Sequence, residues 1–296
     1  MGDVIAFPAL GSRAAVRVEE LVAELSAQLS AAQIPESARE ARDIIAAIVD
    51  EPRFWPSLNR DAMLEGDECQ RARQAARRRT EGAPFAYAVG RAAFRHLTLE
   101  VDERVLIPRQ ETEILVDCVL ARARHGVAID IGTGSGAIAL ALAAEGQFQA
   151  IIATDVSREA LEVTRANARR LSPTLRAPVE VRHGSLLAPV RGERAAVIVS
   201  NPPYVAFEQA PALPRSVRDW EPPLALFAAR QGMALIETIV ADAPDVLKPG
   251  GLLALEVDAG RASLCAELVM SDGRYCEVCV ERDMAGRDRI LLARRH

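Results

Sequence analysis

The sequence predicts an α/β protein in which a doubly wound, Rossmann-like sheet follows a small helical bundle. From Val127 onward, short apolar runs alternate with helical segments, an order that specifies a mainly parallel sheet covered by helices. Before about residue 80, apolar residues recur only at helical spacing. Between these regions, short alternating segments indicate a β-hairpin. We therefore expect a helical domain over residues 1–82, a linking hairpin over 83–108 and the sheet domain over 109–296.

The composition indicates a globular protein of the cell interior. The 296 residues suffice for two ordinary domains, and half of them are apolar. A net charge of -5 argues against a dedicated nucleic-acid binder. No uncharged apolar stretch approaches the ~20 residues of a membrane span. Met1–Pro8 carries neither the basic nor the apolar region of a secretory signal, so we expect a cytoplasmic protein.

The five cysteines form no recognisable framework, which is consistent with a reducing compartment. Cys276 and Cys279 have C-x-x-C spacing, but no second pair or nearby histidine accompanies them. In a regular strand, positions three apart point to opposite faces. We therefore predict no metal site.

The elements before the sheet follow from local patterns. From Val16 to about Arg79, apolar residues at helical spacing, punctuated by Pro35, Pro52 and Gly66, predict four or five short helices and no strand. The basic cluster 71–79 is interpreted as the solvated face of one helix.

The next segments lead into the sheet. Residues 92–94, 97–101 and 105–107 give the hairpin its alternating pattern. Glu111–Arg124 is a predicted amphipathic helix. The predicted strands are 127–131, 150–154, 178–182, 195–200, 252–257, 274–281 and 288–293. The last two are expected to form an antiparallel hairpin at the edge of the sheet.

A glycine-rich loop follows the first predicted strand. Gly132, Gly134 and the adjoining residues join this strand to a helix, and glycines permit positive φ angles and close approach of a ligand to the backbone. Asp130 precedes the loop, and Asp155 ends the next strand, where it can accept hydrogen bonds from ribose hydroxyls. These residues alone fit both a nicotinamide dinucleotide and S-adenosylmethionine.

A second motif, Asn201-Pro202-Pro203-Tyr204, closes the buried run 195–200. Two prolines cannot continue a central strand, so the chain must turn rigidly at the end where open α/β sheets bind ligands. The Asn201 side-chain oxygen and the Pro202 carbonyl can then point at one NH2 group, with the Tyr204 ring covering a planar substrate. Taken alone, the motif is equally compatible with a turn that has no chemistry.

In combination, the two motifs favour one ligand. Asp130, the G-x-G-x-G loop, Asp155 and N-P-P-Y together resemble the class I S-adenosylmethionine-dependent methyltransferases. Within that class, N-P-P-Y is typical of enzymes that methylate exocyclic or amide nitrogens. A nicotinamide-dependent enzyme has no evident use for the second motif.

Further segments resemble one family, the release-factor glutamine N5-methyltransferases. They are L-I-P-R-Q-E-T-E at 106–113, E-P-P-L-A-L at 221–226, A-G-R-D-R at 285–289 and E-A-R at 40–42. The resemblance implies methyl transfer from S-adenosyl-L-methionine, with S-adenosyl-L-homocysteine as product, to the glutamine of a Gly-Gly-Gln loop in peptide chain release factors. Relatives that act on a ribosomal-protein glutamine lack the E-T-E segment.

The resemblance also implies roles for single residues. The catalytic residues would be Asn201, Pro202 and Tyr204, and the substrate glutamine would also contact Pro203 and Phe94. The cofactor would contact Asp130, Gly132, Thr133, Gly134, Ser135, Gly136, Asp155, Ser185, Leu186 and Asn201. No general base is required before attack, because the proton can leave the cationic product. No histidine and no metal is therefore expected in the mechanism.

Three positions depart from the family pattern. Ser185 stands where many relatives carry an acidic residue that accepts from the adenine amino group, and Gln110 replaces a proline. The segment 255–258, L-E-V-D, stands where L-E-I-G is more usual, and from sequence we expect no chemical consequence.

Two rival functions belong to other classes. An N6-adenine or other exocyclic-amine methyltransferase acting on nucleic acid would predict a basic cleft or an added RNA-binding domain. An S-adenosylmethionine-binding scaffold would have no use for a complete N-P-P-Y motif. Nothing in the sequence indicates an obligate dimer, so we expect a monomer whose partners are release factors, without direct nucleic-acid binding.

Overall fold

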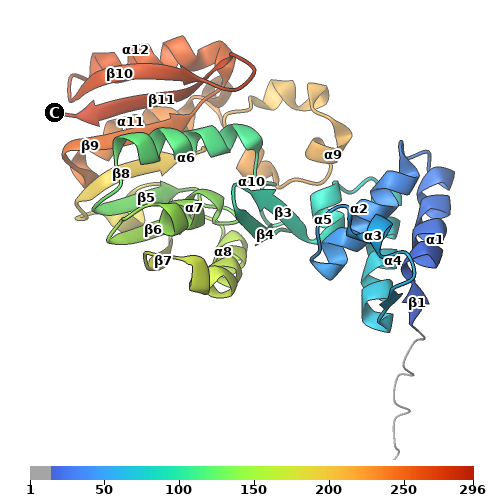
Figure 1. The fold of residues 1–296 in the computed structure, drawn as a ribbon. Helices are drawn as coiled ribbons and strands as arrows, with labels where there is room; N and C mark the ends of the chain where they lie inside the picture. Colours follow the sequence, from blue (N-terminus) through green and yellow to red (C-terminus); the bar gives the residue numbers. More distant parts are fainter. Residues whose placement is uncertain (1–14) are drawn as a thin grey trace, which may run out of the picture. The chain divides into compact units, whose positions relative to one another are not determined.

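The computed structural model describes residues 15–296, and the chain divides after Gly90 into two compact units (Figure 1). Our expectation that Met1–Pro8 is no secretory signal concerns residues outside the described part. The domain limits proposed from sequence remain a prediction, although the contacts group the hairpin with the sheet unit. No helix within residues 15–296 is long and apolar enough to cross a membrane.

The first unit is helical. Its helices are α1 (Val18–Ala31), α2 (Ser37–Val49), α3 (Trp55–Leu58), α4 (Gly66–Thr80) and α5 (Phe85–Val89). Leucines and isoleucines at helical spacing on α1 and α2 form its buried core with alanines of α4. Arginines of the basic cluster on α4 make ion pairs, among them Arg73 with Glu24 and Arg79 with Glu40.

The absence of strands from this unit was predicted wrongly. β1 (Val16–Arg17) pairs antiparallel with β2 (Met63–Leu64). Strands of two residues are too short to show an alternating pattern. This pair instead forms because it joins the start of α1 to the segment before α4 and buries Leu64.

The second unit begins with the predicted hairpin, β3 (Arg91–Phe94) and β4 (Leu97–Glu100). Residues 105–107, which also alternate, are not in a strand. Arg95 at the tip of the hairpin pairs with Glu145 at 2.6 Å and Asp117 at 2.8 Å, which ties the turn to two helices.

The seven-stranded sheet confirms the predicted fold class. Its strands are β5 (Val127–Ile131), β6 (Ala150–Asp155), β7 (Val179–His183), β8 (Ala195–Ser200), β9 (Leu247–Glu256), β10 (Tyr275–Arg282) and β11 (Asp288–Arg295). Their order is β10-β11-β9-β8-β5-β6-β7, and only the contacts of β11 are antiparallel. β9 begins five residues before its predicted start. The sequence Pro249-Gly250-Gly251 suggested a turn there, but a register shift in the pairing with β8 allows the strand to include these residues.

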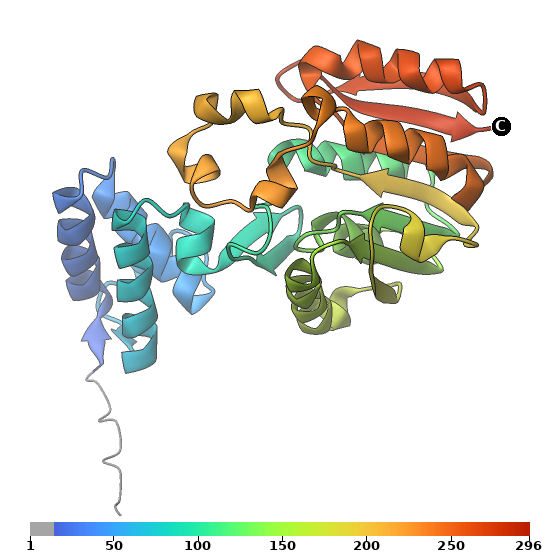
Figure 2. The same ribbon diagram turned by 180° about the vertical axis from the view of Figure 1, so that it is seen from behind.

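Helices cover both faces of the sheet. α6 (Gln110–Arg122), α7 (Ala137–Glu145) and α8 (Arg158–Leu171) lie on the face turned to the viewer in Figure 1. Figure 2, seen from behind, brings α11 (Ala234–Val246) and α12 (Ala262–Asp272) to the front. The short helices α9 (Arg215–Arg218) and α10 (Pro223–Leu226) lie in the segment between β8 and α11.

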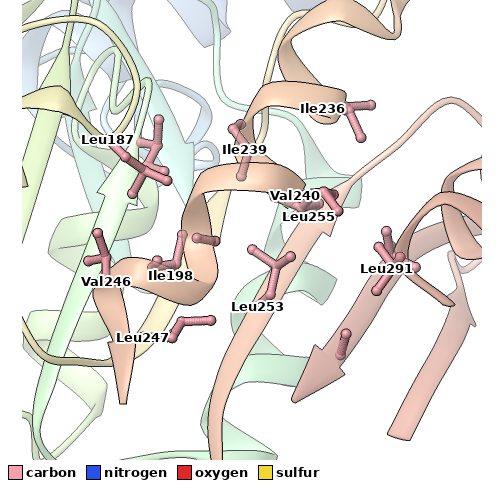
Figure 3. Close-up of a cluster of buried hydrophobic side chains, with 14 of the residues drawn as sticks. Leu187, Ile198, Ile236, Ile239, Val240, Val246, Leu247, Leu253, Leu255 and Leu291 are labelled. Atoms are coloured by element: carbon pink, nitrogen blue, oxygen red, sulfur yellow. The ribbon is translucent and has the colours of Figure 1, made fainter. Parts of the chain in front are cut away.

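One hydrophobic core lies between the sheet and α11 (Figure 3). Buried aliphatic side chains from three strands meet others from this helix. They are Ile198, Leu253, Leu255 and Leu291 from the sheet and Ile236, Ile239 and Val240 from α11. The site is thereby built on strands that are held rigidly from behind.

The two cysteines of the C-x-x-C segment lie on the same face of the sheet, contrary to our sequence argument. Cys276 is opposite Arg294, and Cys279 is opposite Leu292. Cys276 and Cys279 are three residues apart on β10, but their partners on β11 are only two residues apart, because a bulge inserts one extra residue. Glu277, in this bulge, has a φ of 50°. Both thiols are free, and no metal-binding cluster of His, Cys, Asp or Glu occurs among residues 15–296.

Asn167 of α8 connects the hairpin to the glycine loop. Its Oδ1 accepts from the Glu100 N–H at 2.7 Å. Its Nδ2 donates to the carbonyls of Glu100 and Ser135, both at 2.9 Å. The side chain is fully buried, and its removal would leave these three backbone groups without their hydrogen-bond partner.

We expect Asn167→Ala to lower the free energy of unfolding by about 2–4 kcal/mol, because it leaves buried backbone donors and acceptors unsatisfied. Urea denaturation measures the change. Arg169→Ala, on the exposed side of the same helix, should change stability by less than about 0.5 kcal/mol. Equal losses in both variants would contradict the role assigned to Asn167.

Candidate active site

The pairing of the central strands places the two sequence motifs side by side. Ile131 at the end of β5 is opposite Ser200 of β8, and Ser200 is opposite Leu255 of β9. The residues that follow these three, Gly132, Asn201 and Glu256, therefore emerge in one row from the carboxyl edge of the sheet. This is the edge where open α/β sheets bind ligands.

The glycine loop is held by backbone bonds to the neighbouring strand. Gly132 and Thr133 both donate their N–H groups to the Thr154 carbonyl at 2.9 Å. The N–H of Gly134 donates to Asp155 Oδ2 at 2.9 Å. Asp155 Oδ1 accepts from the N–H of Ser157, also at 2.9 Å. The Asp155 carboxylate is thereby fixed beside the loop, with lone pairs left for further donors.

Asp130 lies behind the loop and is fully buried. Its Oδ2 accepts from the Thr133 hydroxyl at 2.7 Å and from the Ala139 N–H at 3.2 Å, whereas its Oδ1 has no partner among the described residues. Burial is the main reason that the pKa of this carboxyl is raised to about 7. A free buried acceptor at this place suits a ligand or water that brings a hydrogen-bond donor.

A cavity of about 320 Å³ opens along the loop. Six of the predicted cofactor residues line it: Gly132, Gly134, Asp155, Ser185, Leu186 and Asn201. The other four do not line the cavity: Asp130 lies on β5, and Thr133, Ser135 and Gly136 lie in the loop. Its size and its mixed apolar and polar lining suit a small organic ligand.

A second cavity, of about 500 Å³, lies on the other side of the N-P-P-Y turn. Both cavities are lined by Leu106, Asn201, Pro202, Pro203 and Ala225. Tyr204 lines only the second cavity. The turn is therefore the wall between two binding spaces, and Asn201 and Pro202 can be reached from both.

A buried chain of hydrogen bonds holds the turn at both ends. Asn201 Nδ2 donates to Thr112 Oγ1 at 3.1 Å, and the Thr112 hydroxyl donates to Glu256 Oε2 at 2.7 Å. The Tyr204 hydroxyl donates to Glu256 Oε1 at 3.3 Å. Since Nδ2 of Asn201 is engaged, its Oδ1 is the end of the amide that remains for a ligand.

Burial is the main influence on the pKa values of Glu256 and Tyr204 in this hydrogen-bond chain. It is the main cause that raises the pKa of Glu256 above its ordinary range, while the Thr112 hydrogen bond and the charge of Arg289 oppose the rise. Burial and the Glu256 charge likewise raise the pKa of Tyr204, so this phenol remains protonated at neutral pH. The Arg289 guanidinium lies 5.8 Å from the centre of the Tyr204 ring.

An ion pair joins two other segments beside the N-P-P-Y turn. Arg109 pairs with Glu221 at 2.6 Å, and the Glu221 side chain is almost fully buried. Glu221 Oε2 also accepts from the Ile107 N–H at 3.3 Å. The contact joins segment 106–113 to segment 221–226, which are separated by more than a hundred residues.

The site as predicted from sequence and the cavities of the structure differ at several residues. Phe94, proposed to flank the substrate, is fully buried in the hairpin and lines neither cavity, and its role remains a prediction. The sequence did not reveal that Thr112 and Glu256 are hydrogen-bonded to each other beside the turn. Gly232 was also missed, although a Cβ there would lie 2.1 Å from the Tyr204 carbonyl oxygen.

Two family models match the chain. The Methyltransferase small domain matches residues 109–213, and the PrmC N-terminal domain matches residues 20–90. The first match contains the glycine loop and the N-P-P-Y turn. The second lies within the helical unit.

Curated relatives and solved structures give a consistent result. A release factor glutamine methyltransferase of Moorella thermoacetica is 38% identical over 225 residues, covering 75% of this chain and 78% of that protein. One from Gloeobacter violaceus is 36% identical and covers 86% and 90%. A methyltransferase structure from Pyrococcus furiosus aligns with a TM-score of 0.52 at 23% identity, over 69% of this chain and 90% of that one, and supports the fold.

The raised pKa of the buried Asp130 carboxyl predicts how the stability of the fold depends on pH. Its pKa in the folded protein, about 7, exceeds its ordinary value of 3.8, so the folded state binds a proton that the unfolded chain releases. This group therefore makes the wild type less stable as pH rises from about 4 to about 7. Asp130→Asn lacks the effect, and its stability relative to wild type should improve between pH 5 and pH 8 by about 2–3 kcal/mol. Urea titrations of the ligand-free proteins test this, and a difference independent of pH would contradict it.

Gly232 makes a prediction about the turn. Its φ is +90°, and an added methyl group would collide with the Tyr204 carbonyl, so Gly232→Ala should lower the free energy of unfolding by about 3 kcal/mol or more. Gly250→Ala is the matched control, because Gly250 has a φ of +73° but open space around it. That control should cost only about 1–2 kcal/mol. Equal losses would show that no collision occurs.

Proposed function

The chain belongs to the release factor glutamine methyltransferases, and we propose that it methylates the side-chain amide nitrogen of the Gly-Gly-Gln glutamine in a peptide chain release factor, with S-adenosyl-L-methionine as donor. The observation that carries the proposal is the N-P-P-Y turn standing between two cavities with the acceptor end of Asn201 free. One cavity would hold the donor and the other the glutamine.

The lining of the smaller cavity fits the methyl donor. S-adenosyl-L-methionine supplies a methyl group already activated by its sulfonium. Asp155, fixed by two backbone N–H groups, retains lone pairs for ribose hydroxyls. Ser185 and Leu186 line the same cavity and would contact the adenine, with Ser185 in place of the acidic residue of many relatives.

The turn provides what an amide nucleophile requires. An amide nitrogen is weakly nucleophilic because its lone pair is delocalised into the carbonyl. Asn201 Oδ1 and the Pro202 carbonyl would accept its two hydrogens, increase electron density on nitrogen and direct the lone pair towards the methyl group. The Tyr204 ring and Pro203 would cover the planar amide. No base is needed before attack, and no histidine lines either cavity in the described part of the chain.

The charges around the larger cavity favour a protein substrate over nucleic acid. Arg109 is committed to Glu221, and Arg289 donates to the Val257 carbonyl at 3.1 Å. Asp258 lines the same cavity with an opposing charge. A site for a polyanion would instead present unpaired basic groups. The exocyclic-amine alternative therefore has less support than the amide.

The function is tested by methyl transfer in vitro. Wild-type protein with methyl-labelled S-adenosyl-L-methionine should label a recombinant bacterial release factor on the Gly-Gly-Gln glutamine, as located by peptide mass spectrometry. Asn201→Ala should lower kcat by about 100-fold or more, since it removes an acceptor aimed at the reacting group. Arg169→Ala should retain wild-type activity.

Two further measurements secure the interpretation. Thermal unfolding and S-adenosyl-L-homocysteine binding of Asn201→Ala show whether the variant is folded and binds the cofactor product. Ribosomal RNA and DNA are offered in parallel as acceptors. Label on nucleic acid, with none on the release factor, would overturn the proposal.

A further inference from the structure

We propose that Thr112 and Glu256 are positioning residues that determine which end of the Asn201 amide faces the substrate. The inference rests on the proposed function, since it concerns the acceptor that would hold the glutamine nitrogen. It is carried by the hydrogen-bond chain that runs from Asn201 through Thr112 to Glu256. Neither positioning residue lines the larger cavity, so both would act through Asn201.

The direction of the chain follows from counting donors. A carboxylate can only accept hydrogen bonds, and a threonine hydroxyl has one hydrogen to donate. That hydrogen is directed at Glu256 Oε2, 2.7 Å away, where both side chains are buried. Thr112 therefore offers Asn201 only a lone pair. Asn201 satisfies it with Nδ2, at 3.1 Å, and its Oδ1 is left facing the binding spaces.

The opposite orientation of the amide would lose contacts at both ends. Rotation by 180° would bring Asn201 Oδ1 against the Thr112 oxygen, so that two acceptors meet. It would also direct Nδ2 at the NH2 group of the substrate, so that two donors meet. Unpaired buried groups of this kind are costly. The hydrogen-bond chain from Glu256 through Thr112 to Asn201, which we call the relay, therefore selects one orientation of the Asn201 amide.

Glu256 is itself held in place from several elements. It lies on β9 opposite Ile290 of β11, and its Oε1 accepts from the Tyr204 hydroxyl. The first and last residues of the N-P-P-Y turn are thus anchored to one carboxylate, Asn201 through Thr112 and Tyr204 directly. The arrangement links the geometry of the acceptor to the position of the ring that would cover the substrate.

The experiment compares Thr112→Val with Thr112→Ser. Valine keeps the shape of threonine and removes the hydroxyl, whereas serine keeps the hydroxyl. Thr112→Val should lower kcat for release-factor methylation by about 10-fold, the value of one buried hydrogen bond, with KM for the factor changed less than about twofold. Thr112→Ser should restore kcat to within about threefold of wild type.

A readout independent of activity uses the substrate-free protein. The side-chain amide of Asn201 is assigned in 1H–15N spectra as the pair of signals lost in Asn201→Ala. Its hydrogen exchange should be slow in wild type and Thr112→Ser and at least about fivefold faster in Thr112→Val, because the hydrogen bond to Thr112 is lost. Glu256→Gln, which can donate to Thr112 and reverse the relay, should lower kcat as Thr112→Val does, and it replaces that variant if the latter does not fold.

The outcomes separate the two proposals. Unchanged kcat and unchanged exchange in Thr112→Val, or equal losses in the valine and serine variants, would overturn the relay. A wild-type protein that shows the protected Asn201 amide but does not label the release factor would contradict the proposed function and leave the relay supported.

Discussion

The structure depends on the register of β8 between β5 and β9. This pairing brings Gly132, Asn201 and Glu256 to one row at the sheet edge, although they come from segments far apart in the chain. A slip of one residue would turn every side chain of β8 to the opposite face and bury apolar residues against the wrong layer. The hydrophobic core between the sheet and α11 therefore fixes the positions of the site residues at the edge of the sheet. The same packing that buries Ile198 determines where Asn201 emerges.

Much of the fold could be predicted because its signals are local. Buried parallel strands are continuous apolar runs, and the glycine loop and the double proline mark their ends unambiguously. The features that escaped prediction depend on pairing partners. The strand pair β1–β2, the early start of β9 and the bulge that turns Cys276 and Cys279 to one face all follow from contacts that no short window contains.

The candidate site divides in the same way. Asn201, Pro202, Asp155 and the glycines could be identified because each lies within a motif that ends a strand. Glu256 could not, because its importance comes from Thr112, 144 residues away in the sequence. Phe94 was proposed to flank the substrate, and its side chain is buried in the hairpin. Residues that orient a functional group through a second side chain have no fixed separation in the sequence, so no motif reveals them.

In the proposed relay, the buried carboxylate of Glu256 would allow a neutral side chain, that of Asn201, to discriminate between substrates. Burying the charge is unfavourable, as the raised pKa of this group indicates, and two hydroxyl donors compensate for part of the cost. In the relay that we propose, the amide of Asn201 then has a single low-energy orientation, with its oxygen available as an acceptor. A site with two fixed acceptors suits a group with two hydrogens, such as a primary amide, and leaves an ester or carboxylate unpaired. Selectivity of this kind arises because the wrong substrate leaves the acceptors of the site without hydrogen-bond donors. It requires that the Asn201 amide cannot rotate to pair with such a substrate.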